Sequence, residues 1–156
     1  MIGTEQVIVR LTAAALLGGV LGLDRELRSK PAGLRTHSLV ALGSALATVA
    51  TMQFLDASDI SAITRTIQGI VAGVGFLGGG AILRAKDREE VTGLTTAASI
   101  WVVASLGVAC GGGFWVASSV SVVLALLVLV LGTPLERFVH THFVARRNGT
   151  AKLPDE

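Results

Sequence analysis

The stretch TIQGIVAGVGFLGGGAIL, residues 66–83, carries no charged side chain and is bounded by Arg65 and Arg84. Because an α-helix rises about 1.5 Å per residue, a segment of this length can cross a hydrocarbon core of about 30 Å. Four further apolar stretches of 17 to 19 residues lie at 7–23, 38–55, 91–109 and 114–132, and Arg10 in the first is their single charged residue. The sequence therefore predicts an all-α, polytopic membrane protein with five transmembrane helices.

The composition agrees with this class and argues against others. Hydrophobic residues make up 51% of the 156 residues and charged residues 15%, which is unusual for a soluble domain. The formal net charge of +2 is too small to indicate nucleic-acid binding. Cys110 is the single cysteine, so the chain cannot form an intrachain disulfide or a cysteine-based metal site.

The positive charges predict the orientation of the helices. Lys and Arg number 0 before the first span, then 4, 1, 3 and 0 in the successive loops, and 4 in the tail. Because short basic loops stay in the cytoplasm, we expect the N-terminus outside and the C-terminus inside. We expect a transmembrane domain over residues 1–132 and a short, partly disordered cytoplasmic tail over residues 133–156.

Glycine dominates the third predicted helix. A G-x-G-x-x-G pattern begins at Gly73, but it lies inside an apolar helix rather than after a strand, so it does not indicate dinucleotide binding. Several of these glycines share one side of the helix, where a neighbouring backbone could approach closely. Alternatively, consecutive glycines loosen the helix and free carbonyl groups to line an ion or water pathway. The candidate glycine-rich face comprises Gly69, Gly73, Gly75, Gly78, Gly79 and Gly80.

Two further patterns concern helix packing and symmetry. Ala14, Gly18 and Gly22 recur every four positions in the first span, which suits a helix partner. The predicted cytoplasmic hairpins share D-R-E followed by G-L-R-T within 24–36, and D-R-E followed by G-L-T-T within 87–96. Because both hairpins have the same orientation, they would form a parallel repeat. Chance similarity is the alternative.

Three blocks of sequence resemble the MgtC/SapB family of bacterial inner-membrane proteins. The block GLDRE at 22–26, followed by KPAGLRTH at 30–37, is similar to that family's first cytoplasmic loop. The segment from Arg65 to Gly80 resembles its third helix, and VTGLTTAASIW at 91–101 resembles its fourth. The resemblance covers roughly residues 5–132 and implies a multi-pass protein of the bacterial inner membrane.

The same resemblance implies a physiological role. It points to magnesium limitation, to survival of pathogens inside host cells and, for some members, to restraint of the F-type ATP synthase. Many members carry a soluble domain after the last helix, whereas about 24 residues follow here, so we expect a short form without that domain. No cofactor is expected, and Mg²⁺ stays open as a ligand or a transported ion.

The first predicted loop supplies a candidate charged collar at the cytoplasmic surface, made of Asp24, Arg25, Glu26, Arg35 and His37. A solvated loop that sets the topology is the simpler interpretation. Alternatively, the turn between the helices returns Arg35 towards the end of the first helix, where it pairs with Asp24 in a partly desolvated site. Asp24 and Glu26 are weak candidate ligands for hydrated Mg²⁺, because the neighbouring arginines compete for the same carboxylates.

Polar residues in the other spans complete the candidate set. Arg65 and Gln68 are expected one turn apart near the outer surface, where they extend into the headgroup region or contact a partner helix or an anion. Thr95 and Thr96 begin the fourth helix as packing or ion-coordinating groups. Trp101 lies in the middle of its span and indicates a helix interface.

No nucleophile, activated water or cofactor site can be assembled from these residues, so we predict that the chain is not an enzyme. We favour a regulator that is surrounded by lipid and binds other transmembrane helices, as a homo-oligomer, a dimer being expected. The alternative is a transporter or channel for Mg²⁺ or another ion. Because five short helices can hardly enclose a wide pathway, that alternative also requires an oligomer.

Overall fold

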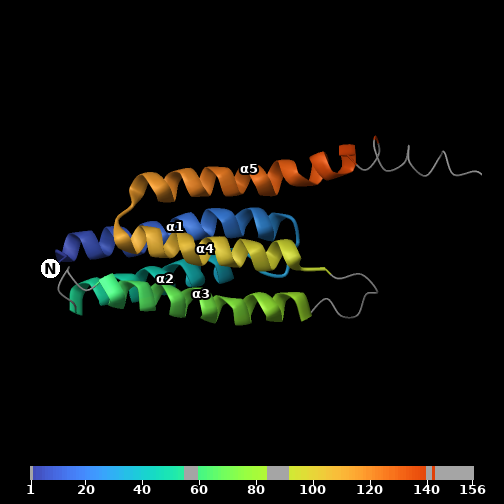
Figure 1. The fold of residues 1–156 in the computed structure, drawn as a ribbon. Helices are drawn as coiled ribbons and strands as arrows, with labels where there is room; N and C mark the ends of the chain where they lie inside the picture. The colour runs from blue at the N-terminus through green and yellow to red at the C-terminus, as the bar shows by residue number, and fades with distance from the viewer. Residues whose placement is uncertain (1, 55–59, 84–91, 140–141, 143–156) are drawn as a thin grey trace, which may run out of the picture. The chain divides into compact units, whose positions relative to one another are not determined.

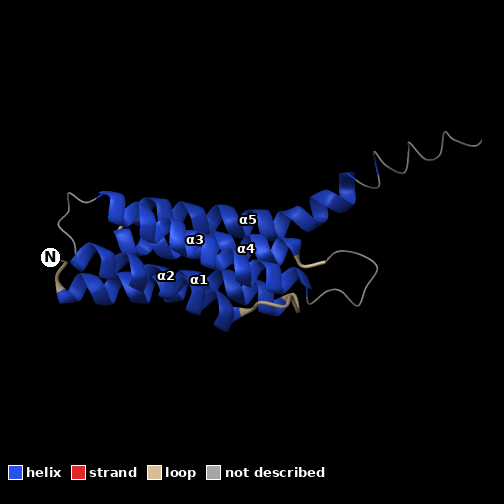
Figure 2. Ribbon diagram, turned by 60° about the horizontal axis from the view of Figure 1, so that its bottom comes forward, coloured by secondary structure: helices blue, strands red, loops and turns tan. Residues whose placement is uncertain are grey.

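The computed structural model describes residues 2–54, 60–83, 92–139 and 142, and within them the chain is helical without strands (Figures 1 and 2). All five helices are long and apolar enough to cross a membrane, which confirms the predicted fold class. Their orientation across the membrane stays a prediction. The helices are α1 (Thr4–Leu27), α2 (Leu34–Phe54), α3 (Ile60–Leu83), α4 (Leu94–Gly112) and α5 (Trp115–Val139).

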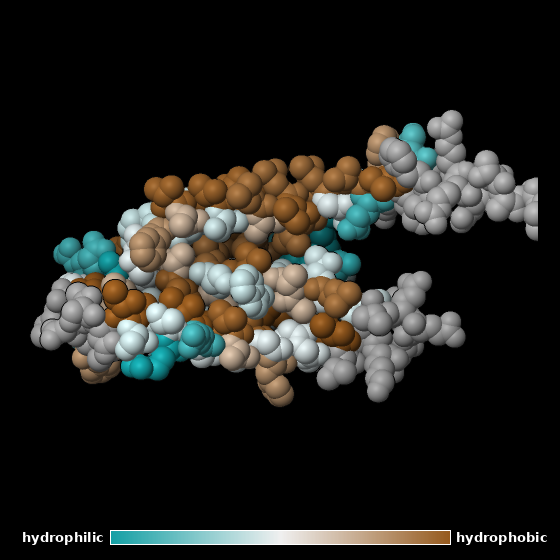
Figure 3. All heavy atoms as spheres, viewed as in Figure 1, coloured by the Kyte–Doolittle hydropathy of each residue, from teal (hydrophilic) through white to brown (hydrophobic). Residues whose placement is uncertain are grey.

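The chain divides into two compact units, Met1–Ala125 and Leu126–Glu156. The first unit holds α1 to α4 and the beginning of α5, and the second holds the rest of α5. Exposed hydrophobic side chains run along α5, and Val116 is 79% exposed (Figure 3). Such an apolar surface is suited to lipid rather than to water.

Four helices are longer than the apolar runs that predicted them, and one of these is α3, which begins at Ile60 rather than at residue 66. The first span was expected to end at residue 23, but α1 continues to Leu27 and therefore includes the charged residues that follow. The second was expected to start at residue 38, but α2 begins at Leu34. The last was expected to end at residue 132, but α5 continues to Val139 with Pro134 inside it.

Local chemistry fixes the ends of α1 and α2. The backbone N–H of Arg28 donates to Asp24 O, and Ser29 then adopts a positive φ of 53°, which stops the helix. At the N-terminus of α2, the backbone N–H of Leu34 has no acceptor within the helix and donates to Glu26 Oε2 at 3.0 Å. Glu26 thus caps α2 from the preceding helix, as a negative charge at a helix N-terminus does.

The helix α4 lies between two glycines with left-handed backbone. Gly93 has φ of 94° and Gly113 has φ of 79°, a region that disfavours other residues. At the C-terminus, the Gly113 N–H donates to Cys110 O and the Phe114 N–H donates to Ala109 O. These two bonds form a Schellman motif that ends α4 and starts the turn into α5.

The core of the first unit is built on close contacts of α2 with α1 and α4. A Cβ added at Gly18 of α1 would lie 2.7 Å from the Cβ of Ala41, and one at Gly107 of α4 would overlap the carbonyl oxygen of the same Ala41. Glycine at these two positions lets both backbones approach α2. The stripe at Ala14, Gly18 and Gly22 is therefore buried inside the chain, and its helix partner is α2.

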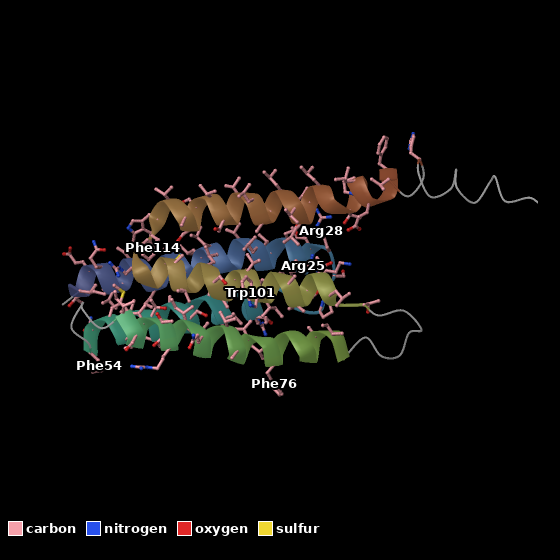
Figure 4. The ribbon with its side chains drawn as sticks, in the orientation of Figure 1. Arg25, Arg28, Phe54, Phe76, Trp101 and Phe114 are labelled. Carbon is pink, nitrogen blue, oxygen red and sulfur yellow. The ribbon has the colours of Figure 1, made fainter. Side chains whose placement is uncertain are left out.

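The glycines of α3 behave differently. A Cβ added at Gly69, Gly73, Gly75, Gly79 or Gly80 would meet no atom within 4 Å, whereas at Gly78 it would contact Ala97 of α4 at 3.4 Å. Phe76 stands among these glycines, 86% exposed and pointing away from the other helices (Figure 4). Most of the predicted glycine face is thus unused in packing within the part of the chain that is described.

Candidate functional site

The residues of the predicted collar separate into buried and exposed groups. Arg25 is 3% exposed and His37 is completely buried, whereas Glu26 and Arg35 are exposed. The reason is that α1 and α2 extend past their apolar runs, so that one face of each extension turns into the bundle. The collar is therefore not one surface loop, and its buried members point towards α4.

Arg25 reaches across from α1 to α4. Its Nη2 donates to Oγ1 of Thr96 at 3.2 Å, and both side chains are buried. The Nε of Arg25 is also buried, and none of the described residues provides it with a hydrogen-bond partner. Among the described residues the one ion pair joins Asp24 and Arg28. No carboxylate oxygen of these described residues therefore lies within 4.0 Å of the Arg25 guanidinium nitrogens. Arg25 thus carries an unused donor inside the bundle.

His37 connects α2 to α4 in the same region. Its Nδ1 lies 3.0 Å from Gly33 O, and its Nε2 lies 3.1 Å from Ser99 Oγ. A carbonyl oxygen can only accept, so Nδ1 carries a proton. Ser99 Oγ also lies 2.8 Å from Thr96 O, to which it donates. The groups Arg25, Thr96, Ser99 and His37 therefore form a polar cluster that links three helices.

The protons of this cluster can be counted. Ser99 has one hydroxyl proton but two neighbouring acceptors when His37 is neutral, namely Nε2 and Thr96 O. If His37 carries both ring protons, Nε2 donates to Ser99 Oγ and the hydroxyl is free to donate to Thr96 O. The position of the Ser99 proton is consequently coupled to the protonation of His37.

The predicted pair between Asp24 and Arg35 is wrong. Asp24 Oδ1 instead accepts from Arg28 Nε at 2.8 Å, an (i, i+4) pair along the extended α1. Arg35 is exposed and no ion pair joins it to the described residues. Arg28 lies one helical turn after Asp24, so the two side chains meet without a reversal of the chain. The turn between them is helical because α1 continues to Leu27.

The two weak candidates for Mg²⁺ have other partners. Asp24 binds Arg28, and Glu26 accepts from the backbone N–H of Leu34. Asp24 Oδ2 is buried and has no hydrogen-bond partner in the part of the chain that the structure describes. Among residues 2–54, 60–83, 92–139 and 142, no group of three or more His, Cys, Asp or Glu side chains could hold a metal ion. Among the described residues these two carboxylates are therefore engaged by other groups and are not part of a cage of ligands.

The remaining predicted residues lie outside the buried cluster. Thr95 is exposed, and Trp101 is 49% exposed on α4 rather than enclosed in a helix interface of the chain (Figure 4). Arg65 and Gln68 are both exposed on α3. Of the predicted repeat, the D-R-E of the second hairpin and the glutamate after it fall within residues 84–91, outside the described residues.

Two interactions were not foreseen. Ser99 contacts His37 of α2, and its hydroxyl at the start of the fourth helix, three residues after Thr96, was the available signal. Arg10 of α1 donates from Nη1 to Gly111 O at 2.8 Å, which satisfies a carbonyl at the end of α4. A cation at a helix C-terminus is also stabilised by the negative end of the helix dipole. Only the presence of a charge inside an apolar run marked Arg10 in the sequence.

Comparison with known proteins gives a consistent result. The model of the MgtC family matches residues 11–138. SrpB of Synechococcus elongatus is 45% identical over 129 residues, which cover 77% of this chain and 71% of SrpB. MgtC of Brucella abortus (strain 2308) is 42% identical over 139 residues, which cover 89% of this chain and 56% of that protein.

A third relative carries a functional name. YhiD of Escherichia coli (strain K12), provisionally named a magnesium transporter, is 40% identical over 131 residues, which cover 81% of this chain and 60% of YhiD. The chain thus spans little more than half of two of these three relatives. No solved structure matches the chain.

Proposed function

Since the chain belongs to the MgtC family, we propose that it is a non-enzymatic regulator of magnesium physiology in the bacterial inner membrane, acting by binding transmembrane helices. The observation that carries this proposal is the outer face of α3, defined here as Ala72, Phe76, Gly79 and Gly80. An aromatic side chain beside glycines with open space above them is a surface on which a second helix can pack closely.

The occupant of this face is a second copy of the chain or another membrane complex, for which the F-type ATP synthase is a candidate. A dimer would use the same face twice, with Phe76 of each copy entering the space above Gly79 and Gly80 of the other. In lipid, such association depends on close packing rather than on the hydrophobic effect. Small residues on an exposed helix face therefore indicate a helix-binding surface better than large apolar residues do.

The interior of the first unit supports contact rather than conduction. The close approach of Gly107 to Ala41 and of Gly111 to Ala45 leaves no room for a hydrated ion between α2 and α4. The buried cluster also carries the positive charge of Arg25, which repels a cation. The name of YhiD favours transport as the second function. A pathway of that kind would lie between copies, along α3.

Cysteine cross-linking in bacterial membranes tests the proposal. Gly80→Cys places a thiol on the outer face of α3, and Leu16→Cys places one on α1, where Leu16 is 64% exposed. We expect oxidation to link Gly80→Cys chains to each other or to one partner protein, and to leave Leu16→Cys chains unlinked. Equal linking from both positions would mean random collision and would contradict a specific face. Cys110 is buried and needs no replacement.

A flux assay separates the two functions. Purified chain in liposomes loaded with a Mg²⁺-sensitive dye should give no more Mg²⁺ entry than protein-free liposomes if it is a regulator. Entry that depends on the chain and disappears in Gly79→Leu would instead establish transport along α3. Gly79→Leu is expected to fold, because a Cβ at this position meets no neighbour.

A further inference from the structure

The crevice between α2 and α3 is not used by the proposed helix-binding face. It has two hollows in succession along the same pair of helices. The first, of about 500 Å³, lies where α2 ends and α3 begins and is lined by Thr51, Phe54, Arg65 and Thr66 among others. The second, of about 410 Å³, lies further along and is floored by Gly43, Gly69 and Gly73. Figure 4 marks the first end by the label of Phe54.

The first hollow presents cationic and hydroxyl groups. Arg65 is exposed there, and among the described residues no ion-pair or hydrogen-bond partner is found for it. The hydroxyls of Thr51 and Thr66 lie 2.8 Å apart in the same hollow, and they also lie within donating distance of Ala47 O and Ala62 O of their own helices, so their two protons are already engaged. The Arg65 guanidinium is therefore the group suited to a phosphate oxygen, because arginine offers several N–H donors in a planar fork.

The second hollow is mostly apolar, and glycines form its floor. A Cβ added at Gly43, Gly69 or Gly73 would meet no atom within 4 Å, and the walls are hydrophobic side chains such as those of Leu39, Ile70 and Leu77. The two hollows together extend along α3 from Ala62 to Leu77, and the part from Thr66, beside Arg65, to Leu77 rises about 16 Å. This length matches one leaflet of the hydrocarbon core, roughly half of 30 Å.

We propose that this crevice binds a membrane phospholipid, with the phosphate at Arg65 and one acyl chain over the glycine floor. Charge and length favour a lipid over a second copy: a helix laid in the crevice would fill the floor but would leave Arg65 without an anion. None of the four residues that define the outer face of α3 lines either hollow, although Phe76 lies near the side of the helix that carries Gly69, seven residues before it.

Lipid binding is measured by native mass spectrometry of the purified full chain, titrated in detergent with palmitoyl-oleoyl phosphatidylglycerol. Arg65→Gln removes the cation, and Gly43→Leu fills the apolar floor. We expect each to weaken binding about tenfold, which is the loss of one charge-assisted contact or of the acyl-chain site. Arg65→Lys should lose less, because a point charge is kept.

Matched controls distinguish the site from general charge or apolar effects. Arg35→Gln removes another exposed arginine of the same chain, and Gly132→Leu adds a leucine at another open glycine, on α5. Both should bind the lipid as the unchanged chain does. Helix content by circular dichroism checks that each variant is folded, as expected for substitutions at open positions.

The remaining outcomes decide between sources of the anion and occupants of the groove. Inorganic phosphate at millimolar concentration should not displace the lipid. If phosphate displaced the lipid equally from the unchanged chain and from Gly43→Leu, the site would bind an anion without an acyl chain. That result would overturn the proposal. So would a loss of dimer without loss of lipid in Gly43→Leu, because the crevice would then be an interface between copies. Gly80→Leu, in contrast, tests the helix-binding face and should leave lipid binding unchanged.

Discussion

Arg25 of α1 and Thr96 of α4 are joined by a buried hydrogen bond of 3.2 Å, although 71 residues separate them in the chain. The guanidinium has no carboxylate partner among the described residues, so a threonine hydroxyl is its recorded acceptor. Because this contact lies between the first and fourth helices, its loss should affect the whole first unit rather than one turn of helix.

Thr96→Val should lower the free energy of unfolding in detergent micelles by about 1–3 kcal/mol, because it leaves a buried charged donor without an acceptor. Thermal unfolding followed by circular dichroism measures this change. Thr95→Val is the control, since Thr95 is exposed, and should change stability by less than about 0.5 kcal/mol. In an Arg25→Met background, Thr96→Val should cost much less; full additivity of the two changes would contradict the bond.

Ser99→Ala should change the imidazole of His37 without moving its Nδ1 proton. The bond from Nδ1 to Gly33 O remains, whereas Nε2 loses its neighbour. Nitrogen-15 NMR of the histidine rings should therefore show a protonated Nδ1 in both proteins and a shifted Nε2 resonance only in Ser99→Ala. An Nε2-protonated neutral ring in the unchanged chain would show that the cluster is arranged differently.

Glu26→Ala should destabilise the chain by about 1 kcal/mol, because the N-terminus of α2 loses its acceptor for the Leu34 N–H. Glu26→Gln keeps an oxygen at the same place and should recover most of this loss. Arg28→Gln removes the exposed partner of Asp24 and should cost at most about 1 kcal/mol, as partly exposed ion pairs do. Denaturation midpoints compare the three variants, and an equal loss in Glu26→Ala and Glu26→Gln would argue against a cap.

Gly18→Leu and Gly80→Leu should give opposite results. The first places a side chain where a Cβ already lies 2.7 Å from Ala41, so it should destabilise the chain by about 1–3 kcal/mol or more. The second enters open space on the outer face of α3 and should leave the fold intact while reducing the dimer or the partner complex. Size-exclusion chromatography with light scattering, together with circular dichroism, reads both properties. A stable Gly18→Leu variant would contradict the packing of α1 on α2.

The fold was predictable because hydropathy records the length of each membrane crossing directly. The ends of the helices were not, since hydropathy stops at the first charged residue. Asp24 and Arg25 were placed in a loop, whereas α1 carries them for another turn. His37 was likewise placed at the surface but lies inside α2, fully buried. Polar residues that continue a helix inside a bundle are stabilised by partners on other helices, and a single sequence does not show those partners.

The candidate site shows the same limit. Arg25, His37 and Thr96 were each singled out, but the bond between the first and fourth helices depends on the arrangement of the bundle and not on any local spacing. The pair between Asp24 and Arg28 could have been found, because four residues on one helix is a local rule. It was missed because the end of α1 was placed four residues too early.

Arg10 and Arg25 stand on α1 about 22 Å apart, and each donates to α4, one to Gly111 O and the other to Thr96 Oγ1. During synthesis, α1 leaves the ribosome long before α4. Until α4 arrives, neither guanidinium has these acceptors, and leaving such a charge unpaired in lipid is costly. Membrane insertion of this protein should therefore require that the two arginines of α1 stay in contact with the insertion machinery, or with water at the membrane surface, until α4 packs against α1.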